Sequence, residues 1–205
     1  GGNDTISASI SSWDTSTIAG GGGNDTMAFY ANEGNASLIT LDTFNTKSDY
    51  DGDDILTAAF TGATTASGVT IQAGGGNDSI HIAVTSLDAQ GNLYQLNAGN
   101  DLLSSLYVSS TTIEGGAGND TIQGATAVLS SFVQLGGGND IFTFAGSGSA
   151  IASGLSGTTI FGGAGADTFT ATNATGLNAS MTIGFQWGFS ALSDSTLSAF
   201  DTISV

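Results

Sequence analysis

The chain has 205 residues, enough for one domain with a hydrophobic core. Its 18 acidic side chains face one basic residue, Lys47, so the formal net charge is −17, and too little positive charge is present to bind a nucleic acid or an anionic membrane. Hydrophobic residues make up 40% and charged ones 9%, which predicts a folded chain, and the absence of Cys leaves packing, metal binding or assembly to stabilise it.

A glycine-rich element that ends in aspartate recurs from one end of the chain to the other. The copies read GGND at 1–4, GGGGND at 20–25, YDGDD at 50–54, GGGND at 74–78, AGND at 98–101, GGAGND at 115–120, GGGND at 136–140, GGAGAD at 162–167 and SAFD at 198–201. Successive aspartates are 21, 29, 24, 23, 19, 20, 27 and 34 residues apart. Each interval is long enough for a two-stranded coil, so residues 1–205 are predicted to form one β-solenoid of about nine coils.

Two apolar columns accompany the repeat. The residue two places after each aspartate is always apolar: Ile6, Met27, Leu56, Ile80, Leu103, Ile122, Phe142, Phe169 and Ile203. Seven places before it stand Ile18, Ile71, Tyr94, Ile113, Val133 and Ile160, whereas Lys47 and Asp194 occupy this place in the two longest coils. We expect an inward-facing column in a first strand and a second strand that ends at the other column.

The alternation of apolar and polar residues has period two, as in Ile80, Ile82 and Val84. It predicts an all-β fold, a right-handed parallel β-solenoid similar to a β-roll, with two parallel sheets and one Gly-Asp turn per coil. Variable loops are expected on the opposite edge, such as residues 30–37, 61–67, 145–158 and 172–180.

Stacking the coils puts the repeated aspartates in a row. At a spacing of ~4.8 Å, neighbouring carboxylates repel by ~1 kcal/mol in water and by several times more when partly dehydrated. Hard divalent cations between the turns would remove this repulsion, and Ca²⁺ suits carboxylate and carbonyl oxygen better than Mg²⁺ does. Zinc is disfavoured because Cys is absent and His81 is the only histidine. We therefore predict several Ca²⁺ ions in a single file.

Two segments resemble a known repeat. Residues 115–123 read GGAGNDTIQ and residues 162–170 read GGAGADTFT, which is similar to the nonapeptide G-G-x-G-x-D-x-U-x of the RTX, or haemolysin-type, calcium-binding repeat family of secreted bacterial proteins. The family's standard roll has 18-residue coils with a calcium turn on both edges, whereas this chain has the motif on one edge only. Asp201 follows Ala199-Phe200 without glycines, which puts a metal there in doubt.

The resemblance implies a set of calcium ligands. The side-chain ligands would be Asp25, Asp78, Asp101, Asp120, Asp140 and Asp167, together with Asp4 and Asp54 from less complete motifs. Backbone carbonyls would complete the shells near Gly22, Asn24, Gly75, Asn77, Gly116, Gly118, Asn119, Gly137, Asn139, Gly163 and Gly165.

The other candidate sites are better explained by structural roles than by catalysis or ligand binding. Asp49, Asp51 and Asp53 imitate the start of an EF-hand loop, but no helical pattern flanks them. His81 falls on the outward side of its strand without a partner for catalysis, so no enzyme activity is expected. The alternating Phe185, Trp187 and Phe189 favour closure of the core over a strip for binding a partner, and Trp13 leaves the same two options open.

These features favour a secreted, calcium-stabilised structural protein of a bacterial surface fibre, S-layer or matrix. The chain starts within a turn motif and stops within a strand pattern, so we expect a mature product or a fragment that self-associates end to end through incomplete coils. The alternative is a calcium-binding secretion and folding module of a larger enzyme, toxin or adhesin, with type I-like export; an ice-binding adhesin is less favoured. No apolar run reaches the ~20 residues of a membrane span, and no nucleic acid partner is expected.

Overall fold

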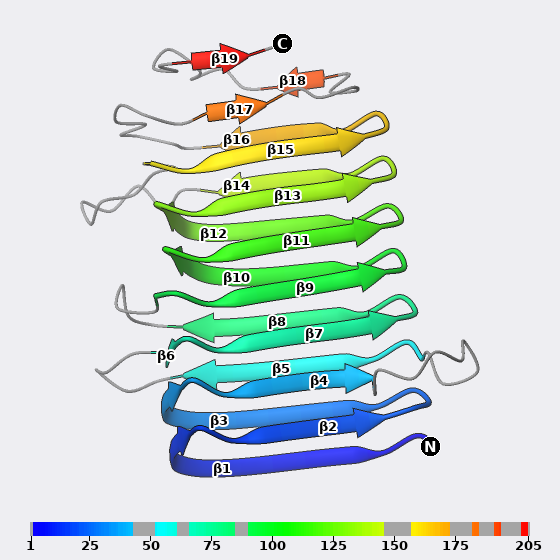
Figure 1. Ribbon diagram of the computed structural model, residues 1–205, viewed down its shortest axis with the longest axis vertical. Helices are drawn as coiled ribbons and strands as arrows, with labels where there is room; N and C mark the ends of the chain where they lie inside the picture. The colour runs from blue at the N-terminus through cyan, green and yellow to red at the C-terminus, as the bar shows by residue number, and fades with distance from the viewer. Residues whose placement is uncertain are drawn as a thin grey trace.

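The computed structural model describes residues 2–42, 52–60, 66–84, 90–145, 157–172, 182–184, 191–193 and 202–204. Its regular structure in these ranges consists of strands in two sheets, and every strand pair is parallel. Apart from the short β6 (Ala66–Ser67), consecutive strands of the chain alternate between the sheets and climb along one axis (Figure 1). This confirms the predicted parallel β-solenoid.

The first sheet has the order β1 (Thr5–Asp14), β3 (Thr26–Asn35), β5 (Ile55–Phe60), β8 (Ser79–Val84), β10 (Leu102–Ser109), β12 (Thr121–Leu129), β14 (Ile141–Ala145), β16 (Thr168–Thr172) and β18 (Ala191–Ser193), and the short β6 (Ala66–Ser67) pairs with the end of β3. The second sheet has the order β2 (Thr17–Gly21), β4 (Leu38–Asp42), β7 (Thr70–Gly75), β9 (Leu93–Ala98), β11 (Thr112–Ala117), β13 (Phe132–Gly137), β15 (Thr159–Ala164), β17 (Thr182–Gly184) and β19 (Thr202–Ser204).

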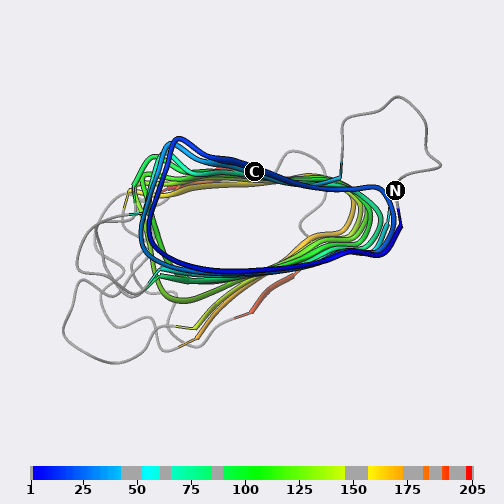
Figure 2. The same ribbon diagram turned by 90° about the horizontal axis from the view of Figure 1, so that it is seen from below.

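The solenoid is flat and right-handed. Figure 2 looks along its axis from the N-terminal end, and the two sheets form the long sides of the cross-section. The chain leaves the N-terminus, runs clockwise through β1 and β2, and rises away from the viewer, which is the sense of a right-handed coil. The glycine-rich turns gather at the edge nearest the N-terminus.

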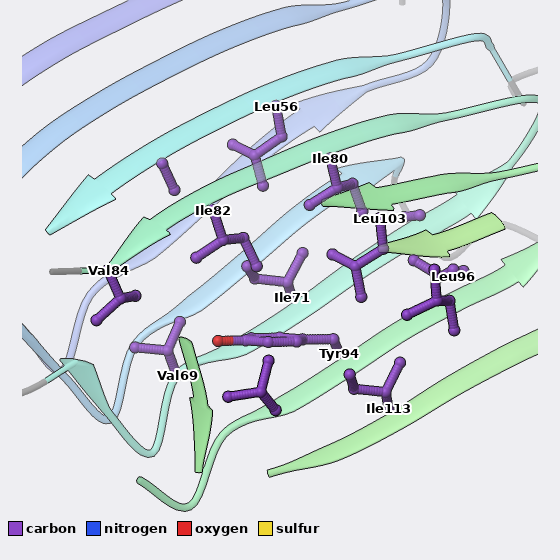
Figure 3. Close-up of a cluster of buried hydrophobic side chains, with 14 of the residues drawn as sticks. Leu56, Val69, Ile71, Ile80, Ile82, Val84, Tyr94, Leu96, Leu103 and Ile113 are labelled. Atoms are coloured by element: carbon purple, nitrogen blue, oxygen red, sulfur yellow. The ribbon is translucent and has the colours of Figure 1, made fainter. Parts of the chain in front are cut away.

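The core lies between the sheets as two facing columns. The column two places after the repeat aspartates is buried from Met27 to Phe169 in the described coils, and Ile6 of the first coil is partly buried. Ile71, Tyr94 and Ile113 face this column from the second sheet (Figure 3). Both predicted columns are therefore inward-facing, because the period-two pleat sends alternate side chains to the interior.

The second strands were predicted to end at their apolar column, and this is wrong. Ile113 is the second residue of β11, which continues to Ala117, and the other described strands of this sheet show the same offset. The strand pattern continues into the glycines, because residues such as Gly116 and Gly136 still pair in register. The turn itself is thus shorter than the glycine-rich motif.

The third coil carries its extra length inside the glycine-side turn. Counting seven residues back from Asp54 assigned Lys47 to the second-sheet column. In the structure Ile39 occupies that position, between Ile18 and Ile71. The additional residues fall between Asp42 and Gly52. An insertion between the strand and the aspartate explains why the fixed spacing failed there.

The last coil also departs from the prediction. Ile203 was assigned to the first-sheet column, but β19 lies in the second sheet with Ile203 beside Ile183. The first-sheet place after Phe169 is filled by Leu192 of β18. Asp201 itself lies outside the described residues, and the segment before it has no glycines that would reverse the chain into the first sheet.

The opposite edge is more regular than predicted. Residues 30–37 are not a loop, because β3 runs to Asn35 in register with β1. Each described coil also makes a left-handed turn there, with positive φ at Thr15, Ala36, Gly68, Gly91, Ser110, Ser130 and Gly157. The remaining predicted loops fall mainly on residues 61–65, 146–156 and 173–181, which lie outside the described ranges.

Side-chain hydrogen bonds support this second turn. The Oγ of Ser131 donates to the Leu129 carbonyl at 2.7 Å and accepts the Thr111 N–H at 3.2 Å. The Oγ of Ser37 donates to the Trp13 carbonyl at 3.1 Å. Trp13 itself is buried, with its ring 4.6 Å from that of Phe29 in an edge-to-face contact, so it closes the core.

The stacked rings of Phe142 and Phe169 give a test of the core, since their centroids are 5.5 Å apart. Phe142→Ala is expected to destabilise the calcium-loaded protein by ~3–5 kcal/mol, because it leaves a cavity between two coils. Ile141→Ala on the same strand is the control: this side chain is 43% exposed, and its loss should cost less than ~1 kcal/mol. Chemical unfolding in saturating calcium measures both, and equal effects would contradict the assignment of inward and outward faces.

Candidate metal centre

A row of buried carboxylates runs along the glycine-side edge. In the described part of the chain, the aspartate that ends each motif is at most 2% exposed in seven coils, at Asp25, Asp54, Asp78, Asp101, Asp120, Asp140 and Asp167. Asp4, in the first coil, is exposed. Each aspartate precedes a first-sheet strand and points inward like the apolar residue two places later, so it lies inside the turn.

One carboxylate oxygen of each buried aspartate is held by the neighbouring coil. Its Oδ1 accepts the backbone N–H of the aspartate in the preceding coil, at donor–acceptor distances of 2.6 to 2.9 Å from Asp4 to Asp167. The donor and acceptor are 21, 29, 24, 23, 19, 20 and 27 residues apart, which reproduces the repeat spacing. The irregular loops therefore leave the contact between turns unchanged.

The second oxygen of each carboxylate has no hydrogen-bond donor. The Oδ2 atoms of all seven buried aspartates are inaccessible to solvent and unpaired. Burial raises the pKa of Asp54 to about 7, of Asp78 to about 8, of Asp101 to about 7 and of Asp140 to about 6, and the charges of neighbouring aspartates add to the effect. An ionised carboxylate left in this state would cost several kcal/mol.

An outer row of amides runs beside the carboxylates in the opposite direction. The backbone N–H of Asn119 donates to the Oδ1 of Asn100 in the preceding coil at 2.7 Å, and Asn139 donates to Asn119 at 2.7 Å. In the third coil Asp53 takes the place of asparagine, is exposed, and accepts the Asn77 N–H at 2.7 Å. In each turn the asparagine N–H thus donates to the preceding coil, and the aspartate N–H donates to the following coil.

Backbone carbonyls lie close to the carboxylates. At Gly20, the position of a Cβ would be 2.5 Å from both the Asp25 Oδ2 and the Leu41 carbonyl oxygen of the next coil. A Cβ on Gly115 would likewise meet the Asp120 Oδ2 and the Leu135 carbonyl. The unpaired oxygen and a carbonyl of the next coil thus approach each of these glycines more closely than a Cβ would allow. Carboxylate and carbonyl oxygens are the donors that a hard cation such as Ca²⁺ prefers.

Four of the predicted carbonyl ligands contact glycines of a neighbouring coil, in one of two ways. The carbonyls of Gly22 and Gly137 accept N–H groups from Gly2 and Gly118 at 2.6 and 2.8 Å. The carbonyls of Gly116 and Gly118 lie against glycines of the next coil, Gly136 and Gly138, where a Cβ would collide with them. No group of three acidic, His or Cys side chains is gathered tightly enough for a ready-made metal cluster in the described residues. Backbone oxygen would therefore have to supply much of each shell.

Four segments match the family model of the RTX calcium-binding nonapeptide repeat: residues 15–35, 66–81, 110–126 and 153–173. The chain carries RTX calcium-binding repeats. Asp25, Asp78, Asp120 and Asp167 fall within the RTX segments, whereas Asp54, Asp101 and Asp140 fall between them and still join the same row. No curated protein and no solved structure matches the chain significantly.

The remaining predicted candidate residues either lie apart from this row or fall outside the described residues. His81 is exposed on β8, on the outward face as predicted. Asp49, Asp51, Lys47 and Asp194 lie outside the described residues, as do Phe185, Trp187 and Phe189. The described residues contain no helix that is long and apolar enough to cross a membrane.

Sequence reasoning missed one acidic residue of the RTX edge, Asp42. It ends β4, is 3% exposed, and pairs with Gly21 in the rung below. The signal was available, because an aspartate stands here where the neighbouring coils have Gly21 and Gly74. The insertion that follows concealed it. Gly21 and Gly74 stand four residues before the aspartates of their motifs, whereas Asp42 stands twelve residues before Asp54.

The close approach of turns can be tested at Gly118, whose φ is +128° and where a Cβ would collide with the Gly99 carbonyl. Gly118→Ala is expected to lower the stability of the calcium-loaded protein by ~1–3 kcal/mol. Gly137→Ala is the matched control, because a Cβ there meets nothing within 4 Å, and it should be neutral or stabilise by up to ~1 kcal/mol. Unfolding in saturating calcium measures both variants. Equal losses would show that tight stacking does not explain the glycines.

The raised carboxyl pKa values predict the pH dependence of the calcium-free protein. The folded state holds protons on Asp54, Asp78 and Asp101 up to about pH 7 to 8, whereas the ordinary value is 3.8. Their stabilisation is thus complete below the unfolded pKa and is lost as pH rises through the folded pKa. In chelator, the thermal midpoint should fall between about pH 5 and pH 8.5. Calcium should abolish that fall, and a midpoint that rises with pH in chelator would contradict the assignment.

Proposed function

We propose that this chain is a calcium-stabilised structural module of an extracellular surface fibre, S-layer or matrix. The observation that carries the proposal is the row of buried carboxylates, each with one oxygen fixed by the next coil and one without a partner. Ions in a single file along this edge would neutralise the row and bridge successive coils. The ligands would be the predicted aspartates with backbone carbonyls between them, Asp4 being the most exposed.

Calcium fits this edge for a chemical reason. The donors are carboxylate and carbonyl oxygens, and the coil lengths vary, so a cation that accepts six to eight oxygens in irregular geometry is favoured over one that needs a strict octahedron. Extracellular modules bind Ca²⁺ at ~10⁻⁴ to 10⁻³ M, which is far above cytosolic concentrations. A chain of this kind would fold after export, when the ions become available.

A structural role is favoured over catalysis. The repeated turn places the same residue types at the same place in successive coils, and that uniformity suits a scaffold more than a single reaction centre. His81 is exposed and makes no hydrogen bond with a hydroxyl or carboxyl side chain of the described residues. We therefore propose a non-enzymatic protein.

Self-association completes the proposal. The described coils stack through parallel strands in register, so a further coil of the same kind can extend each sheet. We propose that a second copy of the chain supplies such a coil.

A secretion and folding module of a larger secreted protein is the second candidate. The match to the RTX repeat favours it, because the calcium-dependent turn would serve that role equally well. The longer reading frame separates the two proposals. A catalytic domain encoded beside this segment would favour the module.

Calcium-dependent folding and assembly are the direct test. At about pH 8, chelator should abolish the β-sheet circular dichroism signal, and ~1 mM calcium should restore it. Asp120→Asn should raise the calcium midpoint, whereas Asp14→Asn should leave it unchanged, since Asp14 is exposed and bonded to Ser12 and Asn35 on the other edge. Spectra that ignore chelator would refute the metal role.

Assembly is measured on the same samples by light scattering and electron microscopy of the calcium-loaded chain. Filaments whose coils continue across the joint between subunits would support the fibre. A loaded chain that stays monomeric at millimolar concentration would exclude end-to-end assembly and leave the folding module as the better proposal.

A further inference from the structure

The third coil differs from the others in its acidic residues. Its first-sheet strand follows Asp54, as the repeat requires, but the strand on the other side of the turn ends in Asp42 where the adjoining coils have glycine. Asp53 replaces the usual asparagine. Residues 42–54 therefore include five aspartates, of which Asp42, Asp53 and Asp54 are described, whereas residues 115–120 include one.

We propose that Asp42 supplies a third carboxylate to the calcium ion that Asp54 and Asp78 share, which makes this the first position in the row to be filled. This inference rests on the proposed single file of ions. It adds a ligand that the repeat motif does not contain and an order in which the positions load.

The surroundings of Asp42 are built to hold its carboxylate. Its Oδ2 accepts the N–H of Gly75 in the next coil at 3.1 Å. A Cβ on Gly74 would lie 2.5 Å from the Asp42 Cβ and 2.6 Å from its Oδ2. Glycine at position 74 therefore leaves the space that the buried carboxylate of Asp42 occupies.

The two other carboxylates present unpaired atoms. The Oδ2 atoms of Asp54 and Asp78 are buried without a hydrogen-bond partner, in residues that are 1% and 2% exposed. Asp42 ends the strand that leads into the turn of Asp54. Its Oδ2 is bonded to the N–H of Gly75, three residues before Asp78, so Asp42 lies at the junction of these two turns.

This charge explains why the position would bind calcium most tightly. The affinity of an oxygen site rises with the number of carboxylate ligands, and three carboxylates leave a net charge of −1 around a divalent ion. The three groups are not gathered into a cluster in the structure, so the ion itself would draw them together. It would then join the end of β4 to the start of β5 across the insertion, where the chain cannot rely on a short glycine turn.

Calcium titration of the whole chain by calorimetry tests the assignment. Asp42→Asn keeps the size of the side chain and an oxygen for the Gly75 N–H but removes the charge. We expect a loss of ~10-fold or more in the affinity of the tightest site, with the weaker sites unchanged. Asp120→Asn should instead remove an ion of ordinary affinity, and Asp14→Asn, which removes an equal charge on the other edge, should change neither.

The wild-type chain gives a second measurement that needs no variant. In hydrogen exchange at decreasing calcium, β5 and β8 should be the last first-sheet strands to lose protection. Loss of their protection together with or before that of β12 and β14 would overturn the inference, as would tight-site affinity unchanged in Asp42→Asn. In either case the loss of an ion in Asp120→Asn would leave the single file intact. Absence of any calcium binding to the wild-type chain would refute both proposals.

Discussion

The structure depends on a conflict between packing and charge at one edge. The fold brings seven inward-facing carboxylates into a row, and the described chain contains no Lys or Arg that could neutralise them. Backbone N–H groups satisfy one oxygen of each, as between Asp101 and Asp120, and leave the other without a partner. Because desolvation penalises each charge by several kcal/mol, the closed turn requires either protons or cations. Packing of the apolar columns does not remove the need for protons or cations, because the same stacking of coils that forms the columns also buries the carboxylates.

If calcium binds at this edge as we propose, metal binding is part of the folding reaction. A solenoid has no long-range core, so each coil is stabilised chiefly by its two neighbours. An ion between two turns acts at that same interface, and it therefore strengthens the contact that spreads order from coil to coil. The opposite edge works without metal: hydroxyl groups such as that of Ser131 fix its left-handed turn by hydrogen bonds to the backbone. One edge therefore carries the proposed calcium sites, while the turns of the other are held by hydrogen bonds within the protein.

Much of this could be predicted from the sequence, because the repeat fixes the features that matter most. The Gly-Asp turn located the buried carboxylates, and the residue two places later, such as Ile122, located the core. The turn at Ser110 and Ser130 was missed because its left-handed position holds Thr, Ala, Gly or Ser and the next position holds Ser, Thr, Asn or Val, so no single letter recurs. Fixed spacing failed at Asp42 because the insertion lies inside the turn, and at Ile203 because β18 takes the first-sheet place. Pairing partners, rather than counts along the chain, decide the register in such cases.

The opposed hydrogen bonds of the two rows give the two ends of the solenoid different faces. The N–H of Asp101 needs the carboxylate of Asp120 in the following coil, whereas the N–H of Asn119 needs the side chain of Asn100 in the coil before it. A coil laid down on the N-terminal side finds its buried acceptor already in place. A coil laid down on the C-terminal side finds the exposed acceptor and a buried N–H donor, which its own carboxylate accepts. The template is thus polar: one face presents buried carboxylate acceptors and the other presents buried N–H donors.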